Sequence, residues 1–223
     1  MNFYGKFRGK VVNNIDPLQL GRLIVLVPAM SDLPLSWAMP CVPYAGEKVG
    51  FFALPPLGAN VWIEFESGDI NYPIWTGCFW GDHEVPAQPA IPTTKLIKTE
   101  TVTLEINDLL TSFSVEVMTP AGPVKLVQDP QGIALTIGET SVKLTMGGVD
   151  LAIPASKVSV TPEGISLKNA SASAQVMPAS VSLKNGAASV ELSPASIEIK
   201  NGAASVALSP ATVSLNNGAL EVM

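Results

Sequence analysis

The sequence is poor in charge, in histidine and in cysteine, and each shortage excludes a class of function. Only 14% of the 223 residues are charged, and 19 acidic residues against 13 basic ones give a formal net charge of −6. Binding to a phosphate backbone requires clustered Lys and Arg, so this balance argues against a nucleic-acid partner. His83 is the one histidine and there are two cysteines, so no set of residues has the ligand spacing of a zinc site.

Long apolar runs are missing as well. The longest one near the N-terminus, residues 23–30, is far too short to span a bilayer, and the first ten residues, MNFYGKFRGK, contain no apolar signal region. We therefore expect synthesis in the cytoplasm without a signal peptide. Cys41 and Cys78 stand in apolar surroundings, which favours two buried free thiols, with a disulfide as the alternative.

Aromatic residues are confined to one part of the chain. All four Trp, all three Tyr and six of the seven Phe lie at or before position 80, and no aromatic residue follows Phe113. Only the first part of the chain can therefore build a globular core of ordinary size. The remainder must be fibrous or must share its core.

The last third of the chain is a repeat. Aligned on their prolines, residues 177–192 read MPASVSLKNGAASVEL, residues 193–208 read SPASIEIKNGAASVAL, and residues 209–223 read SPATVSLNNGALEVM. A degenerate first copy with the same period of 16, TPEGISLKNASASAQV, begins at Thr161. Repetition at a fixed period dictates architecture before any single residue does.

Each 16-residue unit contains two short strands separated by turn formers, either Asn-Gly or Ser-Pro-Ala. Two apolar residues in each strand alternate with small or polar ones, which indicates one buried and one solvated face. The residues expected to face inward are Val181, Leu183, Val190, Leu192, Ile197, Ile199, Val206, Leu208, Val213 and Leu215, followed by Leu220 and Val222 in the last unit.

A unit of this size can bury little by itself. One-chain solenoids use roughly 20 or more residues per coil, whereas 16 residues with two turns leave little to surround. We therefore expect three identical chains wrapped around a common axis, which would bury the apolar pairs and would pair each strand edge with a neighbour. The repeat alone does not fix the number three. The alternatives are a β-rich low-complexity tail and a meander of hairpins.

The first ninety residues predict a small barrel. Short strands are expected within residues 6–27 and 51–80, separated by turns rich in Asn, Asp, Pro and Gly. One of these strands should bury Val61, Ile63 and Phe65 on the same face. Several short strands without helical periodicity are typical of a closed or nearly closed barrel.

Five sequence blocks carry a family resemblance. FRGKVV, DPLQLGRLIVLVP, WAMPCVPYAG, GFFALPPLGANVWIEFESGD and NYPIWTGCFWG resemble, in order, the OB-fold domain of the central spike proteins of contractile injection machines. That family includes phage baseplate assembly protein V, the phage tail lysozyme spike, and the spikes of type VI secretion and extracellular contractile systems. The resemblance covers residues 3 to about 82. Downstream, LIKTETVTLEIND looks like the first strands that follow the barrel in this family.

The resemblance implies a homotrimer in which three barrels form a collar and three C-terminal tails intertwine into a rigid needle. A contracting sheath then pushes the needle through a target envelope. The fold class expected is therefore all-β, with an N-terminal OB-fold barrel followed by an intertwined trimeric triple-stranded β-helix. The domains expected are a collar at residues 1–84, a connector and neck at residues 85–129, and a needle at residues 130–223 with the 16-residue repeat from about residue 161.

The sequence departs from some members of the family. The segment between barrel and needle has no room for a lysozyme domain, and the barrel starts at residue 3, so we expect a separate hub protein at the collar. The chain ends NNGALEVM without the histidine motif that binds a metal at the tip of certain short spikes. We expect no tip metal, and a PAAR-type tip protein that contacts Leu220, Val222 and Met223.

No catalytic or cofactor site is expected. Two carboxylates can hydrolyse glycosides when they are correctly separated, but Glu64 and Glu66 sit on the outer face of one strand near Asp69, which favours a solvated face. His83 has no Ser or Cys motif around it for a triad. The function expected is a non-enzymatic structural spike. The alternatives are a trimeric fibrous adhesin or tail-fibre segment, and an oligonucleotide-binding barrel with a stalk. The residues expected in the barrel core or in collar contacts are Trp37, Trp62, Trp75 and Trp80.

Overall fold

The computed structural model describes residues 2–216 and 219–222 of the chain. The chain divides into two compact units, Met1–Val85 and Pro86–Met223. Both units consist of strands and loops, and the described residues contain one short 3-10 turn, η1 (Glu66–Gly68), and no α-helix. Within the described residues no helix has the length and apolar character needed to cross a membrane.

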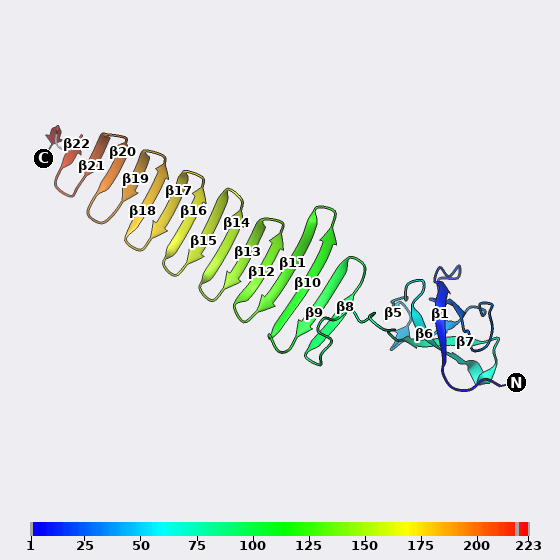
Figure 1. Ribbon diagram of the computed structural model, residues 1–223. Helices are drawn as coiled ribbons and strands as arrows, with labels where there is room; N and C mark the ends of the chain where they lie inside the picture. Colours follow the sequence, from blue (N-terminus) through cyan, green and yellow to red (C-terminus); the bar gives the residue numbers. More distant parts are fainter. Residues whose placement is uncertain (1, 217–218, 223) are drawn as a thin grey trace. The chain divides into compact units, whose positions relative to one another are not determined.

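The first unit is an OB-like half-barrel. Its five-stranded sheet has the order β2-β1-β6-β7-β3, and all neighbours are antiparallel except β3 and β7. The strands are β1 (Phe7–Asn13), β2 (Ile24–Leu26), β3 (Met39–Pro40), β6 (Asn60–Phe65) and β7 (Pro73–Cys78), and a small separate hairpin is formed by β4 (Ala45–Gly46) and β5 (Val49–Gly50). Figure 1 shows this unit in blue to cyan.

Alternating residues of these strands build the core. Val61, Ile63 and Phe65 of β6 are buried on one face, as the sequence predicts. They pack with a cluster that also contains Trp75 of β7, whose indole Nε1–H donates to the Gly21 carbonyl oxygen at 3.1 Å. The remaining members of the cluster are Val11, Leu23, Val25, Val27 and Ala38.

The loop between β1 and β2 is organised by the buried carboxylate of Asp16, whose side chain is 2% exposed. It accepts hydrogen bonds from the Arg22 guanidinium, the shortest from Nη2 at 2.6 Å, and from the backbone N–H groups of Leu18 and Leu20. The Arg22 guanidinium in turn lies over the Trp37 ring, 5.2 Å from its centre. Arg22 and these N–H groups hold the pKa of Asp16 well below its usual range.

Both cysteines are free, as expected, but they are exposed and not buried. The apolar residues next to them in the sequence led to the wrong expectation that both thiols are buried. Cys41 directly follows the short strand β3 and Cys78 is the last residue of β7, so each stands where the chain leaves the sheet and the alternation of buried positions ends.

The second unit is one long antiparallel meander. Its 16-stranded sheet follows the order of the sequence, so each strand pairs with the strand before it and the strand after it (Figure 1). The strands are β8 (Thr94–Lys98), β9 (Val102–Asn107), β10 (Ser112–Thr119), β11 (Gly122–Asp129), β12 (Gly132–Ile137), β13 (Thr140–Thr145), β14 (Gly148–Ile153), β15 (Ser156–Thr161), β16 (Gly164–Asn169), β17 (Ala172–Met177), β18 (Ser180–Asn185), β19 (Ala188–Leu192), β20 (Ile197–Asn201), β21 (Ala204–Leu208), β22 (Val213–Leu215) and β23 (Leu220–Val222).

The strand spacing becomes regular before the sequence repeat is recognisable. From Gly132 to Ala188, the first residues of successive strands are eight residues apart. Gly132 and Gly148 open strands where a Cβ atom would stand 1.9 and 2.1 Å from a backbone oxygen of a neighbouring strand. Close approach of the backbones therefore explains why glycine recurs there at the period of the repeat.

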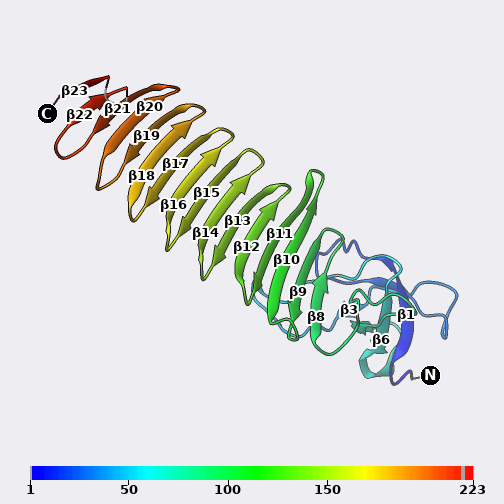
Figure 2. The ribbon, with the colours of Figure 1, turned by 60° about the vertical axis from the view of Figure 1, so that its left-hand side comes forward.

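Most strand edges of this sheet are paired within the chain. β9 to β22 pair on both edges with strands of their own chain, and this long antiparallel sheet is consistent with the expected β-prism. Two-residue turns close most of these hairpins, and the connections that follow β8, β9, β19, β21 and β22 are longer. Figure 2 shows the successive hairpins from a second direction.

Two types of turn recur along the sheet. Where a Ser or Thr precedes the turn, its hydroxyl reaches across to a backbone carbonyl oxygen three residues on, as from Ser193 to Ser196 at 3.1 Å. Another group of turns places its first loop residue at positive φ, with values of 55° at Gly186 and 60° at Gly202. Ala170 holds the equivalent position in the degenerate repeat at φ 47°, where a Cβ atom is strained.

Replacing Asp16 by Asn should destabilise the first unit at neutral pH, because a neutral amide accepts fewer and weaker hydrogen bonds than the buried carboxylate. Since the pKa of Asp16 is lowered by folding, its contribution is present above the unfolded value of about 3.9 and is lost as the pH falls below it. Thermal melting followed by Trp fluorescence should therefore show a deficit of several degrees at pH 7 that shrinks toward pH 2. The exposed Asp32→Asn variant is the control, and an equal deficit in both would contradict the prediction.

Replacing Ala170 by Gly should stabilise the second unit, because glycine removes the strain of positive φ at that turn. The gain expected is about 1 kcal/mol per chain. Ala187→Gly, at the next residue of an equivalent turn, should instead lower stability by making the unfolded chain more flexible. Circular dichroism melts of the two variants should move in opposite directions, and a shift of the same sign would refute this account.

Candidate trimer-forming face

The ten residues predicted to face inward lie on one face of the long sheet. Their strands pair in register, so that Leu183 stands opposite Val190, and Val190 opposite Ile199. Because side chains at alternate positions of a strand share a face, direct pairing places whole columns on the same side. One column contains Val181, Leu192, Ile197, Leu208 and Val213, and the other contains Leu183, Val190, Ile199, Val206 and Leu215.

This apolar face is open in the single chain. Val181, Leu183 and Ile199 are 37%, 52% and 48% exposed, although they stand inside a fully paired sheet. Such values arise because the chain supplies no second layer over the face. An apolar surface that continues over successive strands exceeds what a soluble monomer usually exposes and marks a contact with another molecule.

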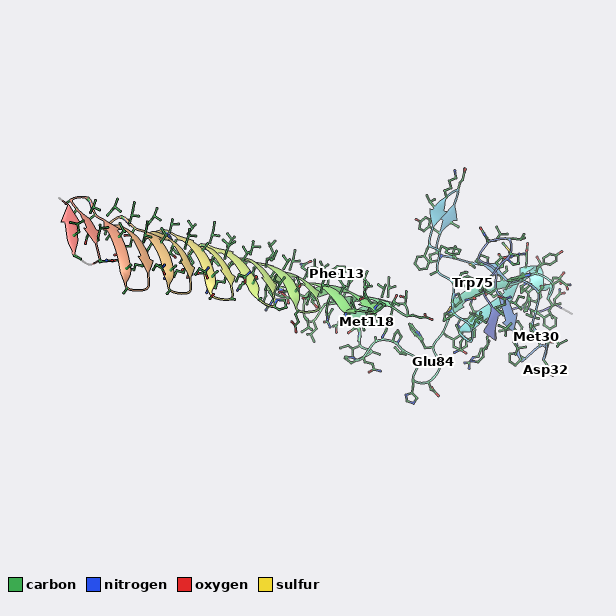
Figure 3. The ribbon with its side chains drawn as sticks, turned by 90° about the horizontal axis from the view of Figure 1, so that it is seen from above. Met30, Asp32, Trp75, Glu84, Phe113 and Met118 are labelled. Carbon is green, nitrogen blue, oxygen red and sulfur yellow. The ribbon has the colours of Figure 1, made fainter. Side chains whose placement is uncertain are left out.

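The face also extends upstream of the predicted residues. Val149 and Leu151 of β14 lie in the same two columns, as shown by their pairing with Val160 and Val158 of β15. Further toward the first unit the columns reach Phe113 of β10, which Figure 3 labels together with Met118 on the opposite face of the same strand. The signal that could have found these residues is the glycine that recurs sixteen residues apart at Gly132, Gly148 and Gly164.

The opposite face of the sheet is polar. Lys157 pairs with Asp150 at 3.0 Å and Lys200 pairs with Glu198 at 2.5 Å. Hydrogen bonds from Ser159 and Lys157 lower the pKa of Asp150 below its ordinary value. Charges of both signs are therefore interspersed on this side, as is usual for a surface that stays in water.

The remaining predicted contact residues lie at the end of the sheet. Leu220 is 56% exposed in β23. The side chain of Val222 and the whole of Met223 lie outside the described residues, so the predicted contact with a tip protein rests there on sequence.

The polar residues of the first unit that were considered for catalysis or metal binding do not come together in one site. Glu64 forms an ion pair with Lys6 at 2.9 Å, and Asp69 accepts hydrogen bonds from Asn71. His83 is exposed. Among the described residues, no group of three or more His, Cys, Asp or Glu side chains could hold a metal ion.

The comparisons with known families fall on both units. Residues 7–80 match the family described as the type VI secretion system/phage-baseplate injector OB domain. Residues 180–221 match the phage baseplate V C-terminal trimerisation domain, and this range contains all ten residues of the two apolar columns that the sequence predicted. The chain belongs to the phage baseplate V family of spike proteins. No curated protein matches it.

The trimerisation match falls on the strands that carry the open face. A trimerisation domain over β18 to β23 supports a homotrimer. The family has a structural spike role and is generally non-enzymatic, and it assembles into a phage tail or secretion particle. The matched OB domain also confirms the predicted all-β class with an N-terminal OB fold.

Replacing Val190 by Asp should prevent trimerisation or leave a heat-labile trimer, because three carboxylates would be buried at one level of the interface. Each uncompensated buried charge costs about 3–5 kcal/mol. Ser189→Asp places the same charge one residue away on the polar face and should leave the assembly intact. Mass measurement in solution and thermal melting would compare the two variants, and an unchanged trimer in Val190→Asp would reject the inward assignment.

Proposed function

We propose that this baseplate V family protein is the central spike of a contractile injection machine and that its needle pierces the target envelope. The observation that carries the proposal is the pair of apolar columns, which continues strand after strand through the trimerisation domain. Three such faces packed together give a solid core with a polar exterior. Close-packed interiors resist compression, and a spike driven by a sheath is loaded along its length.

The proposed division of labour follows the two units. The OB domain forms the collar at residues 1–84, residues 85–129 form a connector and neck, and residues 130–223 form the needle, with the ten column residues as its trimer core. A separate hub protein would bind the collar and a PAAR-type protein would cap the tip at Leu220, Val222 and Met223. The protein would be made in the cytoplasm, would act mechanically and would carry no catalytic site or metal.

The amino-acid distribution supports a piercing role over an adhesive one. An adhesin or tail fibre would present a receptor-binding head, whereas the outward positions of the needle are Ser, Ala, Lys and Glu in a short repeat. Small and charged residues give a surface without large apolar patches. Such a surface suits passage through an envelope and gives little basis for a specific receptor contact.

Complementation in the cells that encode the protein would test this function. In cells lacking the gene, the wild type and Ser189→Asp should restore particles that carry a spike in electron micrographs and that injure target cells. Val190→Asp should restore neither. Particles that still puncture targets without the gene would overturn the proposal, and so would a defect confined to target binding, because that outcome indicates an adhesin.

A further inference from the structure

A column of asparagine and alanine runs beside the two apolar columns. Asn185 of β18 stands opposite Ala188 of β19, and Ala188 stands opposite Asn201 of β20. The same alternation relates Asn169 to Ala172 upstream. Since Asn185 lies two residues from Leu183 on its strand, it shares the face of the apolar residues. The column is therefore part of the apolar face, with one amide in each 16-residue repeat.

These amides are not used to close the turns that follow them. In the first unit and at the start of the long sheet, Asn side chains do this, because Asn13 and Asn107 accept hydrogen bonds from backbone N–H groups two and three residues on. Within the described residues, Asn169, Asn185 and Asn201 make no side-chain hydrogen bond. The Gly202 N–H, in the turn after Asn201, donates to the carbonyl oxygen of Ala187 in the turn after Asn185 at 3.2 Å, so the backbone links these two turns.

The alanines between the amides leave room on the face. Ala188, Asn185 and Asn201 are among the residues that line an open hollow at this end of the strands, together with Leu183, Val190 and Ile199 of the apolar columns and with lysine and serine residues of the opposite face. A small residue flanked by two amides and by apolar side chains forms a site that another protein surface can enter. The hollow lies inside residues 180–221, the segment matched by the trimerisation domain.

We infer that the asparagine column is a polar seam of the trimer, in which the amides of Asn185 and Asn201 are buried against a second copy of the chain and hydrogen-bonded by it. This inference rests on the proposed trimer. The amides are continuous with the apolar columns, so the layer that covers Leu183 and Ile199 covers them too. A buried amide without a partner costs about 1–3 kcal/mol, and with no partner in its own chain each amide takes one from the neighbouring copy.

Aspartate substitution separates this role from turn chemistry. Asn and Asp are similar in size and both favour turns, so Asn185→Asp/Asn201→Asp should be nearly silent if these residues serve only the turns. In a buried seam the double variant places six carboxylates per trimer in an apolar interface. The melting temperature of the full-length trimer at pH 7 should then fall by on the order of 10 °C or more.

The pH dependence of trimer stability provides a second test with the same variant. Burial raises the pKa of an introduced carboxyl, so its penalty is full at neutral pH and disappears below the unfolded value of about 3.9. Relative to wild type at each pH, the double variant should regain stability at pH 3.5. Should it fail to assemble at pH 7, refolding at pH 3.5 should yield trimer, and failure there as well would overturn the inference.

The matched control is Ser189→Asp/Ser205→Asp. These serines lie on the polar face of the same sheet, opposite Lys184 and Lys200, and the control should stay within about 2 °C of wild type at both pH values. If the Asn185→Asp/Asn201→Asp variant forms an intact trimer with the melting temperature of wild type at pH 7, the polar seam is refuted and the proposed trimer is not. A wild-type chain that proves monomeric by mass would instead refute the proposed function.

Discussion

The second unit depends on an apolar face that has no partner in its own chain. Domains are normally built from at least two packed layers around one core, and the long sheet is a single layer. The backbone hydrogen bonds of β9 to β22 are satisfied within the meander. The single chain does not bury its Val, Leu and Ile side chains, such as Leu183 and Ile199. In the proposed trimer, hydrophobic contact between faces would therefore drive assembly.

The two units solve the problem of a core in different ways. The first unit buries Ile63, Trp75 and their neighbours within one chain. The buried carboxylate of Asp16 orders one of its loops. The second unit contains no aromatic residue after Phe113 and uses branched aliphatic residues that repeat at fixed spacing. Bulky aromatics would interrupt a repeating ladder, whereas Val, Leu and Ile can be stacked at every level.

The sequence predicted the faces of the sheet but not the partners of its strands. Alternation at period 2 decides which residues share a face, and the pairing of Val190 with Leu183 and Ile199 confirms that pattern. Alternation carries no information about whether the next strand belongs to the same chain. The turns bear on that choice, and a glycine at positive φ, such as Gly186, closes some of the hairpins locally. The Asn column was hidden for a related reason, because Asn beside Gly suggests turn chemistry whatever face its side chain occupies.

A repeating interface has a weakness that the fold must counter. Shifting one chain by 16 residues would keep most apolar contacts in the needle, because equivalent positions hold Val, Leu or Ile in every copy. Register is weakly specified in such strands. The sequence is not repetitive in β10 and β11, which are eight residues long and place Phe113 opposite Gln128. No position of the needle reproduces that pair. In the proposed trimer, the three chains would therefore be aligned at the end of the neck, and the repeats would then follow in step.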